Sequence, residues 1–343
     1  MHGITESRDA PLDSRIVGTS PIFIAAIELM ARYAECTAPV LIVGESGTGK
    51  ELVARATHYM GPRRDGAFIP VNCGALPESL VESELFGHAR GAFTDAGRAR
   101  LGLVRKAEGG TLFLDEIEAL SPRGQVALLR FLQDASFRSV GDDHVQHADV
   151  RIVAACNVDL RELSQRGEFR ADLFFRLDVL RVRLPPLRDR PEDLDLLVPH
   201  LLRSAARATT GEPKEISDDA LALLRSFDWP GNVRELEHTL LRAHLISTDN
   251  CINVDALLAS APALAKSSAQ VHPARDLASL REAKRSAVCN VERQFVEDAL
   301  AMTNGNISEA ARLCDMQRAS LSKLAKKHAI LAESVRFGGV SGR

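Results

Sequence analysis

Short apolar runs alternate with helical patterns over the first half of the chain. Four of these runs are apolar at consecutive positions and rich in β-branched residues, at 38–44, 67–73, 110–116 and 150–157. Strands buried on both faces of a parallel sheet show this pattern, whereas strands with one face in water alternate apolar and polar residues. Because helical patterns separate the runs, we predict an α/β fold with a parallel sheet flanked by helices.

From residue 191 to residue 258 only helical patterns remain, interrupted by the turn DWPGN at 228–232. A segment rich in Ala, Ser and Pro follows, which is typical of a linker, and helical patterns return from about residue 280. These changes predict a polar N-terminal tail (1–15), an α/β subdomain (16–185), a helical subdomain (186–258), a linker (259–283), an all-α domain (284–330) and a C-terminal tail (331–343).

Composition narrows the setting in which the protein works. The chain has no apolar run of ~18 residues and no secretory signal, so we expect no membrane partner. Its six cysteines are scattered without a C-x-x-C pair, which favours reduced thiols in the cytoplasm over disulfides or a zinc site. The net charge of −3 means that any contact with nucleic acid must come from a local basic patch.

The segment GESGTGK at 44–50 has the features of a phosphate-binding loop. It follows a predicted strand and opens a predicted helix, where backbone N–H groups and the helix dipole both favour a phosphate. A glycine turn without a ligand is the alternative, which this context disfavours. Lys50 can reach the terminal phosphates of ATP, but Glu51 stands where the general motif has the Ser or Thr that binds Mg²⁺. Another group must then hold the ion.

Two carboxylates at the end of the third predicted strand can supply that group. In TLFLDE (111–116), apolar residues lead to Asp115 and Glu116. Asp115 can hold Mg²⁺, directly or through water, and Glu116 can act as the general base that polarises an attacking water. Arg170 and Arg176 suit the charge on a transferring phosphoryl group, although their spacing alone favours ordinary surface ion pairs.

Five motifs follow one another along the chain: GESGTGKE, ESELFGHARGAFTDA, GGTLFLDEI, FRADLFFRL and DWPGNVREL. Through them the chain resembles the bacterial enhancer-binding proteins, the NtrC-like AAA+ activators of sigma-54 RNA polymerase. The resemblance covers about residues 16–250 and 286–330. It implies an AAA+ P-loop sheet flanked by helices, a helical lid over 186–258, and a Fis-type helix-turn-helix DNA-binding domain within 284–330.

The resemblance also implies roles around the nucleotide, which would be ATP with Mg²⁺. Asp115 and Glu116 correspond to the Walker B motif, with Asp115 as the metal ligand. Asn72 resembles the switch residue that holds the catalytic glutamate, Asn157 resembles sensor I, and Arg234 resembles sensor II. The Walker A motif, in which this family commonly has a final Glu, corresponds to Gly44, Glu45, Ser46, Gly47, Thr48, Gly49, Lys50 and Glu51.

Two further parts of the resemblance concern partners. Arg170 and Arg176 correspond to arginine fingers that reach a neighbouring subunit, which reverses the preference for surface ion pairs and implies a ring, by resemblance a hexamer. The family's GAFTGA loop grips sigma-54, so the contact residues here would be Gly91, Ala92, Phe93, Thr94, Asp95 and Ala96. Asp95 replaces a glycine, which removes backbone freedom and adds a negative charge. Some family members tolerate this change.

The C-terminal region combines an apolar stripe with a basic segment. The stripe recurs at helical spacing and predicts helix packing, to which the resemblance adds a dimer contact; it comprises Val288, Val291, Phe295, Ala299 and Met302. Helical segments at 306–314 and 317–327 with a turn between them form a helix-turn-helix pattern. Five basic residues oppose one acidic residue within 312–327. The candidates for base or phosphate contacts are Arg312, Gln317, Arg318, Ser320, Ser322, Lys323, Lys326 and Lys327.

Together these expectations describe a cytoplasmic, ATP-dependent transcriptional activator. It binds enhancer DNA, assembles from dimers into a ring, and remodels the closed complex of sigma-54 RNA polymerase holoenzyme into an open complex. One alternative is a DNA-binding regulator that retains ATP binding without productive sigma-54 contact, as Asp95 permits. Another is an unrelated AAA+ machine, against which the segment 82–96 speaks. Because about 15 polar residues precede the AAA+ module, we expect no built-in sensor domain, and either constitutive competence or control by a regulatory protein in trans.

Overall fold

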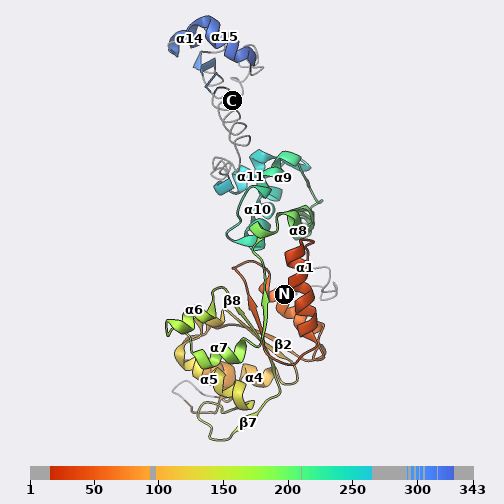
Figure 1. Cartoon of the computed structure of the whole chain (residues 1–343), viewed down its shortest axis with the longest axis vertical. Coiled ribbons are helices and arrows are strands. Elements are labelled where there is room, and N and C mark those ends of the chain that lie inside the picture. The colour runs from red at the N-terminus through yellow and green to blue at the C-terminus, as the bar shows by residue number, and fades with distance from the viewer. Residues whose placement is uncertain are drawn as a thin grey trace. The chain divides into compact units, whose positions relative to one another are not determined.

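The computed structural model describes residues 16–92, 98–209, 211–264 and, with gaps, part of 292–327. The chain divides between Ser267 and Ser268 into two compact units, which are described here one by one (Figure 1). Among the described residues, none of the helices combines the length and the apolar character that a bilayer crossing requires.

A five-stranded sheet forms the centre of the first unit. Its strands lie in the order β2-β5-β8-β1-β9, and every pair is parallel. The four predicted strands and the parallel sheet are confirmed. The strands are β1 (Val40–Val43), β2 (Phe68–Asn72), β5 (Thr111–Asp115), β8 (Arg151–Cys156) and β9 (Leu180–Arg183).

Strand β9 was absent from the predicted strands. It lies at the edge of the sheet and pairs only with β1 among the described strands. Within its sequence LRVR, Val182 is fully buried whereas Arg183 is exposed. An edge strand that places arginines between apolar residues lacks the continuous apolar run of a central strand, so the search for such runs did not detect it.

Both faces of the sheet are buried, because successive side chains of each strand point to opposite sides. Leu112 and Leu114 pack into one core, and Phe113 packs into the other. Burial of one such side chain contributes about 1.5–3 kcal/mol. The first core is covered by α3 (Val81–Phe86), α4 (Leu103–Lys106), α5 (Pro122–Asp134), α6 (Leu160–Gln165) and α7 (Ala171–Leu177), and the second by α1 (Pro21–Ala34) and α2 (Lys50–Tyr59).

Two short antiparallel hairpins accompany the sheet. One pairs β3 (Gly87–His88) with β4 (Arg100–Leu101), and the other pairs β6 (Ser136–Phe137) with β7 (Gln146–His147). The two hairpins touch, because the backbone N–H of Val140 donates to the carbonyl oxygen of Gly87 at 2.9 Å. The first hairpin therefore has a neighbour that supports its base.

The lid follows the sheet and has a core of its own around Trp229, which is 1% exposed and donates its indole N–H to the carbonyl oxygen of Leu224 at 2.8 Å. Its helices are α8 (Leu194–Thr209), α9 (Asp218–Arg225), α10 (Asn232–Ile246) and α11 (Val254–Ser260), preceded by the 3-10 turns η4 (Leu187–Asp189) and η5 (Pro191–Asp193). The expectation that this region is entirely helical is wrong in one detail. Strands β10 (Glu215–Ile216) and β11 (Cys251–Ile252) form a small parallel pair.

The second unit contains α14 (Ile307–Leu313) and α15 (Arg318–Lys327), which pack around Ala310, Ala311 and Leu321. The predicted apolar stripe is only partly a packing face. Ala299 is buried, but Phe295 is 43% exposed and Met302 is 76% exposed. Val288 and Val291 lie outside the described residues. Besides Ala299, the buried residues of this stretch are Val296 and Leu300, which were not part of the predicted stripe.

Candidate functional site

The loop between β1 and α2 is shaped to receive a phosphate. Gly47 and Gly49 adopt the left-handed conformation, with φ of 77° and 100°, which glycine reaches without strain. Gly49 is the N-cap residue of α2 and offers no side chain to cap it, so the helix N-terminus presents backbone N–H groups. A Cβ added at Gly49 would meet nothing within 4 Å. An uncapped helix start beside open space is a fitting place for an anion.

Lys50 extends from the first turn of α2 into this loop. Its side chain is nearly buried, and its ammonium donates to the carbonyl oxygens of Gly44 at 2.8 Å and Glu45 at 3.0 Å, and to Oδ1 of Asn157. Burial lowers the pKa of Lys50, and Asp115 opposes that shift. Three acceptors thus set the orientation of the Lys50 ammonium group in the loop.

Asp115 and Glu116 stand at the carboxyl end of β5, directly beside the end of β2. The register pairs Asn72 with Asp115. The backbone N–H of Glu116 donates to Oδ1 of Asp115 at 3.0 Å, while burial raises the pKa of Asp115. Glu116 has φ of 52°, a conformation that is costly for a residue with a side chain and that often occurs at functional sites.

Asn72 and Glu116 approach each other across Gly74. A Cβ added at Gly74 would lie 3.0 Å from Oε2 of Glu116 and 3.2 Å from Oδ1 of Asn72. The Asn72 side chain accepts from the backbone N–H of Ala75 at 3.1 Å and caps the turn η2 (Cys73–Ala75). The switch role of Asn72 stays a prediction: the two side chains are neighbours, and Asn72 bonds to the turn in this arrangement.

Glu118 joins this group, although sequence reasoning did not single it out. It lies in the turn η3 (Ile117–Ala119), and its Oε1 accepts from the backbone N–H of Asn157 at 2.9 Å. Its Oε2 is buried without a hydrogen-bond partner among the described residues. The available signal was the DEIE spacing, because one turn after Glu116 returns a side chain to the same edge of the sheet.

The two candidate arginine fingers lie at the two ends of α7, with Arg170 as its N-cap residue and Arg176 in its last turn. The guanidinium of Arg170 forms a bidentate pair with Asp172, with N–O distances of 3.0 and 2.7 Å. Arg176 is exposed one helix length further on. In the described residues, no hydrogen bond or ion pair joins either arginine to the phosphate loop of its own chain. The roles of both in trans stay predictions.

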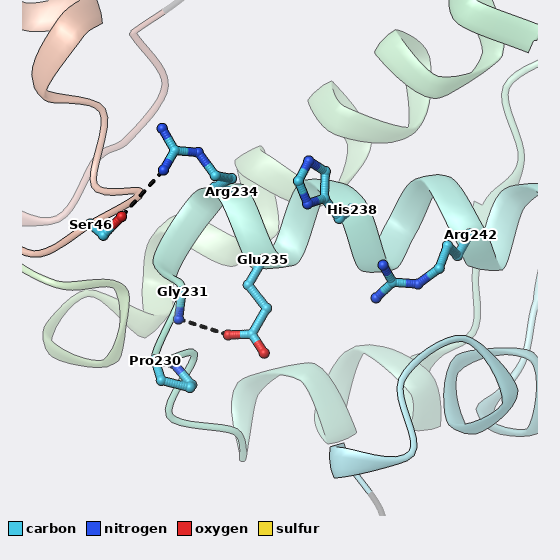
Figure 2. Close-up of a pocket in the computed structure, with 7 residues that line it drawn as sticks. All are labelled: Ser46, Pro230, Gly231, Arg234, Glu235, His238 and Arg242. Carbon is cyan, nitrogen blue, oxygen red and sulfur yellow. Dashed lines mark hydrogen bonds between the residues drawn. The ribbon is translucent and has the colours of Figure 1, made fainter. Parts of the chain in front are cut away.

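The lid contacts the phosphate loop directly. Arg234 donates to Oγ of Ser46 at 3.2 Å, and the backbone N–H of Val233 donates to the carbonyl oxygen of Gly47 at 3.0 Å. Figure 2 shows the adjoining pocket of about 360 Å³, which is lined by Ser46, Pro230, Gly231, Arg234, Glu235, His238 and Arg242. The structure therefore brings the predicted sensor II residue to the loop that it is expected to monitor.

In the sequence, the GAFTDA segment (91–96) lies between the strands β3 and β4 of the first hairpin. Gly87 has φ of 81°, and a Cβ there would lie 2.4 Å from the carbonyl oxygen of Arg100, so glycine permits the strands to approach. Ala92 packs against Gly141 of the neighbouring hairpin. Of the predicted contact residues, Gly91 and Ala92 are described; the other four, Phe93, Thr94, Asp95 and Ala96, lie outside the described residues.

The predicted DNA-contacting residues cluster on α14 and α15. Asn306 caps α14 by accepting from the backbone N–H groups of Ser308 and Glu309. Arg312, Gln317 and Arg318 are exposed, as are Ser320 and Lys323, and Ser322 is partly exposed. Lys326 and Lys327 belong to α15, but their side chains lie outside the described residues.

Comparison with known proteins agrees with this arrangement. Residues 16–183 match the family described as "Sigma-54 interaction domain", residues 188–274 match "AAA+ ATPase lid domain", and residues 288–326 match "Bacterial regulatory protein, Fis family". The crystal structure of NtrX from Brucella abortus in complex with ATP is similar with a TM-score of 0.68 at 30% identity, over 92% of this chain and 69% of that chain.

Two relatives indicate how much of a longer protein the chain corresponds to. It is 41% identical to the response regulator protein PilR from Pseudomonas aeruginosa over 94% of this chain and 71% of PilR. It is 47% identical to the Nif-specific regulatory protein from Azotobacter vinelandii over 71% of this chain and 46% of that protein. The chain thus spans about half of one relative and about seven-tenths of the other. It belongs to the sigma-54-dependent, enhancer-binding activators, a family built on an AAA+ ATPase module with a Fis-type helix-turn-helix.

Proposed function

We propose that this chain hydrolyses ATP in an oligomeric ring and uses that energy to remodel the closed complex of sigma-54 RNA polymerase into an open complex. The observation that carries the proposal is the meeting of Lys50, Asp115 and Glu116 at one edge of the sheet, beside the uncapped start of α2. The same chain carries the hairpin with GAFTDA and a helix-turn-helix.

The residues at the carboxyl end of the sheet would have separate roles in ATP binding and hydrolysis. Lys50 and the N-terminus of α2 would bind the phosphates, and Asp115 would hold Mg²⁺, which neutralises phosphate charge when bound. Mg²⁺ commonly takes one or two carboxylates together with phosphate oxygens and water, which fits the absence of a closed cluster of three His, Cys, Asp or Glu ligands among the described residues. Glu116 would accept a proton from the attacking water.

Oligomerisation completes the proposed site. Arg170 and Arg176 are exposed on α7 and have no contact with the loop of their own chain among the described residues. As arginine fingers they would act on the site of the next subunit, which makes hydrolysis depend on assembly from dimers into a hexameric ring. This dependence would place the reaction under the control of local protein concentration on enhancer DNA.

Two contacts would connect the motor to transcription in the cytoplasm. The GAFTDA segment would engage sigma-54. Helix α15 would lie in a groove of the DNA, with Gln317, Arg318 and Lys323 nearest the bases or phosphates. Control by a regulatory protein in trans stays a prediction from the sequence.

A second candidate function rests on Asp95. A negative charge in place of glycine within GAFTDA favours a regulator that binds DNA and ATP without productive contact with sigma-54. Both candidates bind DNA and ATP. They differ in whether the GAFTDA loop makes productive contact with sigma-54.

Open-complex formation with sigma-54 polymerase and a supercoiled promoter separates the two candidates. First, the ATPase rates of the native chain and of Asp95→Gly would be measured as a function of protein concentration. Open-complex formation by the two proteins would then be compared at concentrations that give equal ATPase rates. A cooperative rise in ATPase together with open complexes from the native chain supports the remodeller. Normal ATPase with open complexes only from Asp95→Gly would establish the DNA-binding regulator. A native chain without ATPase at any concentration would overturn the remodeller, and one that also fails to bind ATP would overturn both.

A further inference from the structure

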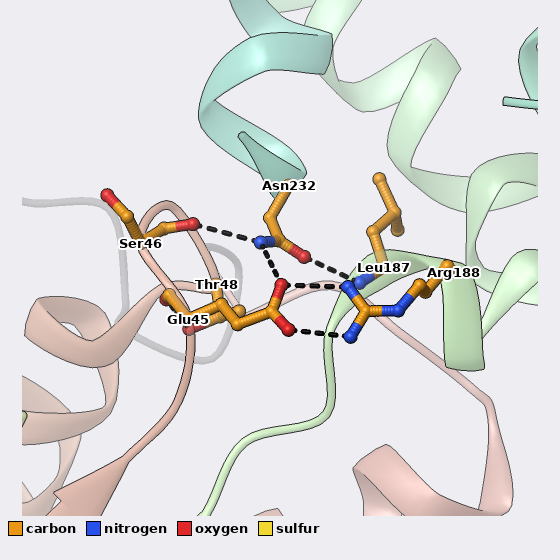
Figure 3. Close-up of polar contacts among 6 residues, drawn as sticks. All are labelled: Glu45, Ser46, Thr48, Leu187, Arg188 and Asn232. Carbon is orange, nitrogen blue, oxygen red and sulfur yellow. Dashed lines mark hydrogen bonds and ion pairs between the residues drawn. The ribbon is translucent and has the colours of Figure 1, made fainter. Parts of the chain in front are cut away.

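The proposed phosphate loop contains a carboxylate, Glu45, and an arginine at the start of the lid balances its charge. Glu45 pairs with Arg188 of η4 through two bonds, from Nη1 to Oε2 at 2.8 Å and from Nη2 to Oε1 at 2.6 Å (Figure 3). Asn232 adds a third bond, from Nδ2 to Oε2 of Glu45 at 3.2 Å. The hydrogen bond from Arg188 lowers the pKa of Glu45 despite its partial burial, so the carboxylate is charged at neutral pH.

The backbone of Glu45 is also one of the three acceptors that orient Lys50. Its backbone carbonyl accepts from Lys50 at 3.0 Å and from the hydroxyl of Thr48 at 2.8 Å. The side chain of Glu45 thus fastens to the lid while its backbone fastens to the phosphate-binding groups.

Asn232 joins three segments with one amide. It is fully buried and adopts the left-handed conformation with φ of 51°. Its Oδ1 accepts from the backbone N–H of Leu187 at 2.7 Å, and its Nδ2 donates to the carbonyl oxygen of Ser46 at 2.9 Å as well as to Glu45. Both ends of the amide are used, so the residue fixes the start of the lid against the loop.

The ion pair between Arg188 and Glu45 is poorly suited to stabilise the fold. The side chains of Arg188 and Glu45 are 41% and 40% exposed, and ion pairs in such positions contribute little to unfolding free energy. The lid is held together instead by its own core around Trp229. The contacts do fix the orientation of the Glu45 carboxylate, one residue of the loop that also holds Lys50.

We propose that Arg188 and Asn232 are positioning residues for the phosphate loop, which hold Glu45 away from the bound polyphosphate and keep Lys50 in register. The inference rests on the proposed ATPase function. It follows that loss of Arg188 leaves the Glu45 carboxylate without its counter-ion beside the phosphates, and that removal of the Glu45 charge compensates for that loss.

The test compares the full chain with Arg188→Ala, the double variant Arg188→Ala/Glu45→Gln, and Arg225→Ala. The last is a matched control, because Arg225 forms a similarly exposed pair with Asp195 within the lid and does not touch the loop. Three quantities are measured: the Kd of a fluorescent non-hydrolysable ATP analogue, KM and kcat for ATP, and the Tm without nucleotide.

Arg188→Ala is expected to raise Kd and KM about five- to tenfold, the low end of typical coupling between linked sites, with a smaller change in kcat. The double variant recovers most of the lost affinity, and Arg225→Ala binds like the native chain. The Tm without nucleotide stays within about 3 °C across the set, since exposed pairs contribute little.

An Arg188→Ala chain that binds the analogue as tightly as the native chain would overturn the inference, as would a double variant that recovers nothing. A loss of affinity that merely follows a fall in Tm would reduce Arg188 to a structural residue. A native chain that does not bind the analogue at all overturns the proposed function as well, so the two failures are distinguishable.

Discussion

The carbonyl oxygen of Gly231 in the lid lies 2.2 Å from the point where a Cβ on Gly47 would stand. The phosphate loop and the lid therefore meet backbone to backbone, and the absence of a side chain at Gly47 is what allows the contact. The N–H of Val233 donates to the Gly47 carbonyl at 3.0 Å in the same place.

We expect Gly47→Ala to separate the lid from the loop. The variant has to accept both the left-handed conformation, which costs about 1–2 kcal/mol, and the displacement of Gly231. Gly167→Ala is the control, since Gly167 has φ of 74° but open space around it. Thermal unfolding without nucleotide should show a larger loss for Gly47→Ala, and nucleotide titration should show weaker binding only for that variant. Equal losses of Tm with unchanged binding would show that the backbone contact is unimportant.

Glu116→Gln is expected to separate binding from hydrolysis. The substitution keeps the size and the hydrogen-bonding reach of the side chain but removes its basicity, which typically costs 10²–10⁴-fold in rate, so we expect kcat to fall by at least ~100-fold. Analogue binding should remain within about threefold of native, since Lys50 and the α2 N-terminus are untouched. If hydrolysis survived, another carboxylate would be the base, and Glu118 would be the first to replace.

Mixing two inactive variants tests whether the arginines act between subunits. Arg176→Ala retains Glu116, and Glu116→Gln retains Arg176, so neighbours in a mixed ring can form a complete site from the two defective chains. Random assembly of equal amounts should restore up to about a quarter of the native ATPase rate. A mixture no more active than its separate components would place Arg176 outside the neighbouring site, provided that both variants still assemble by light scattering.

Acid should weaken the fold through His58. This side chain is buried, with Nδ1 at 2.9 Å from Oγ1 of Thr111, and burial lowers its pKa below the ordinary value of 6.5. Below pH 6.5 the unfolded chain therefore takes up a proton that the folded chain resists, so stability falls as the pH drops.

A His58→Gln variant removes the contribution of His58 to the pH dependence of stability. Between pH 6.5 and pH 5.5 it should lose up to about 1 kcal/mol less unfolding free energy than the native chain, as measured by urea unfolding at each pH. Only the difference between the two slopes is informative, because other groups titrate in both proteins. Parallel slopes would mean that His58 is protonated as easily in the folded chain as in the unfolded one.

The group of polar residues at the carboxyl end of the sheet was predictable, because it follows from local patterns. Asp115, Asn72 and Asn157 each come directly after an apolar run, and parallel strands end at one edge, so their proximity needed no further information. The strand β9 was missed because its arginines break the apolar run. The bonds of Glu45 to Arg188 and Asn232 join residues 143 and 187 positions apart. No periodicity encodes such a pairing, and only the fold of the lid reveals it.

The contact between the phosphate loop and the lid also bears on how the gene can be recombined. A crossover placed near residue 186, between two family members, would look neutral, because it falls between two cores that pack separately. Yet it would take Glu45 and Gly47 from one parent and Arg188, Gly231 and Asn232 from the other. Chimaeras built at that point should fold and still bind nucleotide poorly unless both parents agree at these positions, so a functional exchange has to carry the loop and the lid together.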